Sequence, residues 1–215
     1  MILRSNNVLS CPRIESRWTV RGGLLHNVAN LVKAKLEEIK QIGEKRMSKF
    51  IDPAKVPKRR LYTGEEIPCI GMGTFGSDRF SAEEISNAVY GAVQCGYRLF
   101  DCASVYQNED QIGEVFEKAF RNGLVKREEL HITSKVWNDM HGKGDVLLSL
   151  AKTLKDLKLD YVDTYFLHWP FPNYHAPGCD GDARNPDSRP FSVEEFMATW
   201  RQLERIQKMG LARNI

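Results

Sequence analysis

Short apolar runs and longer helical segments alternate along most of the chain. The apolar runs are typical of buried strands and cover residues 69–75, 97–102, 131–136 and 161–169. The segments between and after them are predicted helices, which cover residues 81–96, 108–122, 145–157 and 192–210. This alternation predicts a parallel sheet whose strands are joined by right-handed crossovers.

Capping residues mark several of the predicted helix boundaries. Ser81 is followed three residues later by Glu84, which predicts a capping box, and Gly96 predicts the end of the same helix. Ser192 and Glu195 repeat the capping pattern near the carboxyl terminus. The helix boundaries therefore have local signals of their own.

The predicted fold class is α/β, of the (β/α)8 TIM-barrel type. Residues 59–68 form a predicted β-hairpin around Gly64 before the first barrel strand, and residues 212–215 begin a fifth strand. A complete barrel needs roughly 250 residues, whereas 169 residues follow position 46 in this chain of 215. The sequence thus predicts about half a barrel, with an N-terminal β-hairpin.

The first 46 residues differ from the rest. They carry nine Lys and Arg against four Asp and Glu, and residues 24–42 place apolar side chains at three- and four-residue steps, which predicts an amphipathic helix. We interpret residues 1–46 as an extension outside the barrel, and residues 47–215 as the N-terminal half of the barrel. The extension is a surface helix, an Arg-rich targeting segment, or a non-native stretch upstream of translation that begins at Met47.

Composition removes several classes of function. The net charge is +3, but after residue 46 there are 22 basic and 24 acidic residues, so a nucleic-acid surface is not indicated. No window has the apolar run that a membrane span requires. The five cysteines show no paired spacing, which argues against a disulfide framework or zinc site and favours a reducing, cytoplasmic compartment.

Ionisable side chains follow the ends of successive predicted strands. Asp101 ends one strand, Lys135 the next and His168 the third, while Tyr106 lies five residues beyond Asp101. Strand alternation puts Thr133 with Lys135 on one face. Because a parallel barrel gathers its site at the carboxyl ends of its strands, we expect the four ionisable groups to converge.

Together these groups have a definite chemistry. A free phenol is a poor proton donor at neutral pH, with a pKa of about 10, but a neighbouring ammonium group favours the phenolate. Asp101 would hold Lys135 charged, and His168 would orient a substrate oxygen. Tyr106 could then protonate that oxygen during carbonyl reduction. Each residue alone has an ordinary structural explanation, but four such coincidences at adjacent strand ends are less probable than a shared site.

Four motifs carry a family resemblance. GMGTF (71–75), GYRLFDCASVYQNE (96–109), ITSK (132–135) and DTYFLHWP (163–170) resemble the aldo-keto reductase motifs in order and spacing. The resemblance covers residues 58–215 and implies a (β/α)8 barrel that uses NADPH to reduce small aldehydes and ketones. It also implies a protein that is monomeric when full length and binds no nucleic acid, membrane or metal.

The resemblance also assigns roles to residues. It implies that Tyr106 is the acid, that Lys135 tunes it, that Asp101 pairs with Lys135, and that His168 orients the carbonyl. The residues expected near the cofactor are Gly73, Thr74 and Asp101. The expected walls of the substrate pocket are Phe75, Trp137 and Trp169.

The sequence departs from the family pattern after Ile215. Members of the family continue into a Gly-x-Ser-Asn strand and further loops that hold the nicotinamide and phosphates. The resemblance therefore implies that this chain is truncated after the fourth β/α unit and is inactive by itself.

Three alternatives remain open at this stage. In one, Lys135 forms a Schiff base in an aldolase-like barrel. In another, the chain is a non-enzymatic module that binds the cofactor as a sensor. In the third, the barrel is a metal-dependent hydrolase, for which only His168 has a suitable position.

Overall fold

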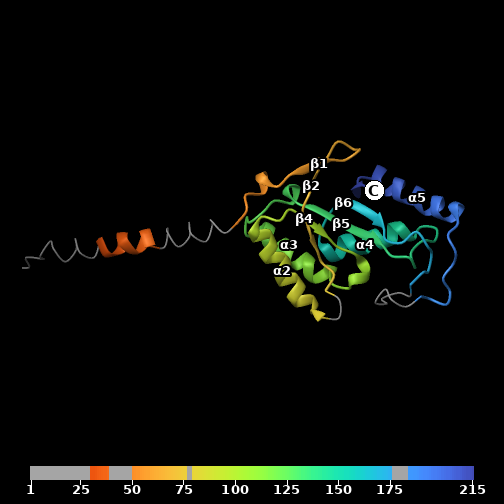
Figure 1. The fold of residues 1–215 in the computed structure, drawn as a ribbon, viewed down its shortest axis with the longest axis horizontal. Helices are drawn as coiled ribbons and strands as arrows, with labels where there is room; N and C mark the ends of the chain where they lie inside the picture. The colour runs from red at the N-terminus through yellow and green to blue at the C-terminus, as the bar shows by residue number, and fades with distance from the viewer. Residues whose placement is uncertain (1–29, 39–49, 77–78, 176–183) are drawn as a thin grey trace, which may run out of the picture. The chain divides into compact units, whose positions relative to one another are not determined.

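The computed structural model describes residues 30–38, 50–76, 79–175 and 184–215 (Figure 1). The chain divides into two units, Met1–Ser48 and Lys49–Ile215. In the first unit, residues 30–38 are helical and exposed, within the predicted helix at 24–42; the remainder of that prediction lies outside the described residues. Within the described ranges, no helix combines the length and apolar character needed to cross a membrane.

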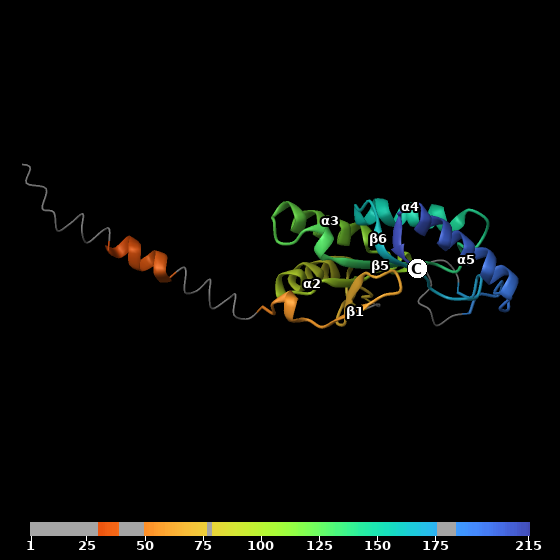
Figure 2. The ribbon, with the colours of Figure 1, turned by 90° about the horizontal axis from the view of Figure 1, so that it is seen from above.

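The second unit is built on a five-stranded parallel sheet. Its strands pair in chain order: β3 (Met72–Gly73), β4 (Leu99–Asp101), β5 (His131–Val136), β6 (Val162–Leu167) and β7 (Ala212–Asn214). The connecting helices are α2 (Ala82–Cys95), α3 (Glu109–Arg121), α4 (Asp145–Leu157) and α5 (Val193–Lys208). Figure 2 shows these helices following one another around the strands. The predicted α/β fold, four β/α units of a barrel and a fifth strand, is confirmed.

Local signals set the boundaries of helix α2. The hydroxyl of Ser81 accepts from the N–H of Glu84, and the Glu84 carboxylate accepts from the N–H of Ser81, which completes the predicted capping box. Gly96 ends the helix with φ +101°, a left-handed conformation that favours glycine. Its position also allows a close approach, because a Cβ there would lie 2.2 Å from the carbonyl oxygen of Ile51.

Some strands are shorter than predicted. The strand expected over residues 69–75 is limited to β3, Met72–Gly73. At the start of the predicted strand, the N–H of Cys69 donates to the carbonyl of Pro57 at 2.8 Å, so Cys69 takes no part in the parallel ladder. Strand β5 and helix α4 have the predicted bounds.

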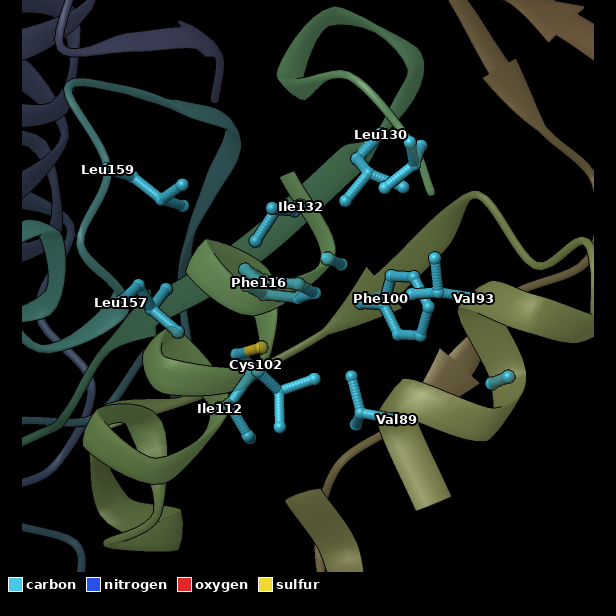
Figure 3. Packing of buried hydrophobic residues seen from close by; sticks show 14 residues of the cluster. Val89, Val93, Phe100, Cys102, Ile112, Phe116, Leu130, Ile132, Leu157 and Leu159 are labelled. Atoms are coloured by element: carbon cyan, nitrogen blue, oxygen red, sulfur yellow. The ribbon is translucent and has the colours of Figure 1, made fainter. Parts of the chain in front are cut away.

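Two apolar clusters pack the helices onto the outer face of the sheet. In the first, Phe100 of β4 meets Phe116 of α3 edge to face, with ring centroids 5.5 Å apart (Figure 3). In the second, Tyr165 of β6 is buried and its hydroxyl lies 2.9 Å from the hydroxyl of Ser149 on α4. Since these residues face the helices, strand alternation turns Lys135 and Phe166 to the inner face.

Polar contacts close the amino ends of the strands. The antiparallel hairpin of β1 (Lys58–Arg60) and β2 (Glu66–Pro68) lies at this end. The side-chain amide of Asn214 in β7 donates, at 2.7 Å, to the carboxylate of Glu65, which directly precedes β2. It also donates to the carbonyl of Asp163 at 2.8 Å. The hairpin is thereby attached to the last strand of the sheet.

Candidate active site

The structure brings the four predicted catalytic groups together at the carboxyl ends of β4, β5 and β6. The Lys135 ammonium nitrogen lies 2.9 Å from the Asp101 carboxylate, 3.3 Å from the Tyr106 hydroxyl and 2.7 Å from the carbonyl oxygen of Cys102. Only 13% of the Lys135 side chain is exposed, so the ammonium is held among these partners. The ammonium is thus within hydrogen-bonding distance of both the carboxylate and the phenol.

His168 completes the group from the next strand. It follows β6 directly, and its ring centroid lies 5.9 Å from that of Tyr106 and 4.9 Å from that of Trp137. Burial, followed by the charge of Lys135, lowers the pKa of His168 to about 4, while Asp101 opposes the shift. The imidazole is therefore neutral at pH 7 and has one N–H to donate.

The backbone between Asp101 and Tyr106 places the phenol. Residues Ser104–Tyr106 form a short 3-10 turn, η3, and Gln107 then adopts a left-handed conformation with φ 54°. The Ser104 hydroxyl donates to the carbonyl of Lys135 at 3.2 Å, which fastens this turn to β5. This turn brings the Tyr106 hydroxyl back over the strand ends.

The residues expected near a cofactor surround the backbone of Asp101. Gly73 pairs with Asp101 across the β3–β4 ladder, and both the N–H and the hydroxyl of Thr74 donate to the Asp101 carbonyl at 3.1 Å. Asn108 donates to the carbonyl of Thr74 at 2.9 Å. A Cβ at Gly73 would meet nothing within 4 Å, so open space adjoins this backbone at the mouth of the site. The backbone at Gly73 therefore leaves room for a ligand to approach it.

The three predicted wall residues are placed differently from one another. Phe75 lies 5.0 Å from the Tyr106 ring and is 57% exposed, while Trp137 is buried against His168. Trp169 has its ring contacts with Tyr174 and His175 instead, at 5.5 and 5.0 Å. Two of the three therefore contact the catalytic group directly.

Two further residues lie at the site, and neither has a role predicted from the sequence. The Thr133 hydroxyl donates to Asp101 at 2.6 Å and helps Lys135 to fix that carboxylate. His175 stacks on Trp137 with centroids 5.9 Å apart. Strand alternation, which places Thr133 beside Lys135, was a signal for the first; nothing in the sequence pattern points to the second.

A buried carboxylate supports the site from behind. Glu109 is 3% exposed and accepts hydrogen bonds from Ser134 at 2.6 Å and Thr153 at 3.0 Å, so it joins α3, β5 and α4. Burial raises the pKa of Glu109, and the two hydroxyls partly offset this shift. Since Ser134 precedes Lys135, Glu109 fixes the strand that carries the ammonium.

We expect NMR titration to show the low pKa of His168 directly. Its imidazole resonances should titrate with a midpoint near 4, well below the value of about 6.5 for a free imidazole. The imidazole of His168 binds a proton more readily in the unfolded chain than in the folded protein. The contribution of His168 to the free energy of unfolding therefore falls as pH drops from about 6.5 toward about 4. A midpoint near 6.5 for His168 would contradict the buried environment described here.

The described residues contain no group of three or more His, Cys, Asp or Glu side chains that could hold a metal ion. What the arrangement offers is proton transfer: a phenol beside an ammonium, opposite a neutral imidazole. Such a set can deliver a proton to an oxygen that the imidazole holds.

Comparison with known proteins gives the class to which this site belongs. A sequence model of the Aldo/keto reductase family matches residues 69–215, and the chain belongs to this family. It is 41% identical over 167 residues to an NADH-dependent D-xylose reductase of Candida parapsilosis, a match that covers 74% of this chain and 50% of that protein. It is 42% identical over 157 residues to aldo-keto reductase family 1 member A1 of Gallus gallus, covering 72% and 46%.

A solved structure gives the same result for the fold. The crystal structure of a Bombyx mori aldo-keto reductase in complex with NADP matches with a TM-score of 0.63 and 37% identity, covering 74% of this chain and 48% of that one. The chain thus spans about half the length of the relatives it matches.

Proposed function

We propose that the whole protein, of which this chain supplies the catalytic groups, reduces aldehydes or ketones to alcohols with a nicotinamide cofactor. The observation that carries the proposal is the placement of the Lys135 ammonium between Asp101 and Tyr106, at 2.9 and 3.3 Å. The NADP of the Bombyx mori structure and the NADH named for the Candida parapsilosis reductase support a nicotinamide cofactor. Of NADPH and NADH, we propose that the protein uses NADPH.

Each side chain has a separate task in this proposal. When bound, the reduced nicotinamide supplies a hydride to the carbonyl carbon. The neutral imidazole of His168 donates a hydrogen bond to the carbonyl oxygen and orients it. Tyr106 gives that oxygen its proton, and Lys135 stabilises the phenolate that is left.

Other residues keep this machinery in place. Asp101 holds the ammonium of Lys135 in position, and Thr133 in turn holds the carboxylate of Asp101. Gly73 and Thr74 would border the nicotinamide, and Phe75, Trp137 and Trp169 would form apolar walls for the substrate. We propose that the remaining cofactor contacts come from the half of the relatives that this chain does not span, so that the chain alone is inactive.

Turnover measurements test the proposal. We expect the 215-residue chain to show no aldehyde-dependent oxidation of NADPH, and the same chain continued by the second half of the Candida parapsilosis relative to show it. Absence of turnover by a folded, extended protein that still binds NADPH would favour the binding-module alternative. Borohydride trapping of a substrate on Lys135 without nicotinamide would instead favour Schiff-base chemistry.

A further inference from the structure

A cleft lies at the opposite end of the sheet from the proposed catalytic groups. It has a volume of about 590 Å³ and is found at the amino ends of the strands, where it is lined by the first residue of β5, His131, and by Asp163 of β6. Lys135 and His168 lie at the other ends of these strands. The cleft is therefore separate from the proposed site of carbonyl reduction.

A strap of backbone, residues 51–57, forms one wall of this cleft. At one end, the N–H of Ile51 donates to the carbonyl of Cys95 at 3.2 Å; at the other, the carbonyl of Pro57 accepts from Cys69 at 2.8 Å. Between them lies the short turn η1 (Pro53–Lys55), capped by Asp52. Because the strap is attached at both ends, the cleft exists before any ligand binds.

Most of the cleft lining is apolar. Its apolar lining includes Ile51, Pro53, Val56, Ile70, Tyr97 and Leu130. Ile51 and Ile70 are 62% and 57% exposed, so they present apolar surface to a ligand. Cavities of about 300–1,000 Å³ with such walls are typical of small-molecule sites.

The charged part of the lining has an excess of carboxylates. Five carboxylates stand against three Lys and Arg side chains. Burial lowers the pKa of His131, so its imidazole adds no positive charge at neutral pH. Within the lining, carboxylates therefore outnumber cations by two, and Arg127, which lies outside the lining, pairs with one of them, Asp163, at 2.8 Å.

Contacts within the lining show where this excess lies. Arg213 lies 3.6 Å from Glu65 and 3.7 Å from Asp163, and Lys58 lies 3.7 Å from Glu66. Two of the three cations in the lining, Arg213 and Lys58, are therefore paired with three of its five carboxylates.

The two remaining carboxylates are neighbours on the short turn η4 (Arg127–Glu129). Glu128 has no hydrogen bond or ion pair among the described residues, and Glu129 accepts only a main-chain N–H, from Lys126 at 2.7 Å. The third cation, Arg98, donates to two main-chain carbonyls. Both carboxylates are exposed at the cleft; the positive charge of Arg98 acts on Glu129, whereas Glu128 has no cationic partner among the described residues.

We propose that this cleft binds a small organic cation, a primary amine on an apolar or aromatic body. The apolar walls would bury the body, the ring of Tyr97 offers an aromatic surface, and the ammonium group would lie against Glu128 and Glu129. An anion of the same shape would meet the excess negative charge, and a neutral analogue would gain only the apolar contacts.

Binding of three matched probes to the 215-residue chain tests this proposal. Phenethylamine, phenethyl alcohol and phenylpropionate share an aromatic body and differ in charge. By NMR titration, we expect resonances of Ile51, Ile70 and Tyr97 to shift with phenethylamine, and the amine to bind at least about fivefold more tightly than the carboxylate.

Two variants and a control locate the binding. Replacing both carboxylates by glutamine, Glu128→Gln with Glu129→Gln, should weaken amine binding about fivefold and leave the alcohol unaffected. Ala54→Trp, on the strap, should fill the cleft and abolish binding of both, and its circular dichroism would confirm folding. The control, Asp160→Asn with Glu194→Gln, removes the same charge outside the cleft and should change nothing.

Each contrary result overturns the proposal. Equal binding of the three probes, an equal loss in the control variant, or shifts confined to residues outside the cleft would each do so. None of these measurements depends on NADPH or on turnover, so the proposal stands or falls separately from the reductase function.

Discussion

Tyr106→Phe in the extended protein is expected to lower kcat by about 10²–10⁴-fold, the usual contribution of a positioned proton donor. The phenylalanine ring keeps the contact with Phe75, whose centroid lies 5.0 Å away, and removes only the hydroxyl that lies 3.3 Å from the Lys135 nitrogen. Binding of NADPH, measured by quenching of tryptophan fluorescence, should stay nearly unchanged. The loss of kcat would then be due to the missing proton donor alone.

A second tyrosine provides the control for this result. The hydroxyl of Tyr90 on α2 accepts from Asn122 at 3.3 Å, away from the strand ends. Tyr90→Phe should keep full turnover. If Tyr106→Phe retained turnover within a few-fold of the parent, the acid role of Tyr106 would be wrong.

Asp163→Ala is expected to destabilise the fold by about 3–5 kcal/mol, the usual cost of leaving a buried charge without its partner. The Asp163 side chain is 5% exposed, and one of its oxygens accepts from Arg127 and from the main-chain N–H of Ile132, both at 2.8 Å. Removing it leaves a guanidinium that is 14% exposed without its carboxylate, and an N–H of β5 without its acceptor.

Urea denaturation of the 215-residue chain would measure this effect. Asp163→Asn should cost less than Asp163→Ala, because an amide oxygen can still accept from Ile132. Asp160→Ala, at an exposed position three residues earlier, should change the free energy of unfolding by less than about 0.5 kcal/mol. Equal small effects at positions 160 and 163 would show that the buried contacts contribute little.

Much of the fold could be predicted because its signals are local. The capping box at Ser81, the glycine at position 96 and the alternation of β5 each depend on a few adjacent residues, and each is found as expected. The convergence of Asp101, Lys135 and His168 also followed from a simple rule, that parallel strands gather their carboxyl ends at one edge.

Other features depend on contacts between distant residues and had no local signal. The stacking of His175 on Trp137 depends on the path of a loop. The exclusion of Cys69 from the sheet depends on its hydrogen bond to Pro57, and the strap that lines the cleft is attached by the same bond. Strand alternation and helix-capping residues give no information about such contacts between distant residues.

The order of the strands has a consequence for synthesis of the chain on the ribosome. Each strand of the sheet pairs with the next one along the sequence, and the four proposed catalytic side chains all fall between Asp101 and His168. Each pairing closes a loop of one β/α unit, which costs less chain entropy than pairing strands farther apart in the sequence. We therefore expect the phenol, the ammonium and the imidazole to meet while α5 and β7 are still being translated, so that nascent protein acquires its proton-transfer geometry early.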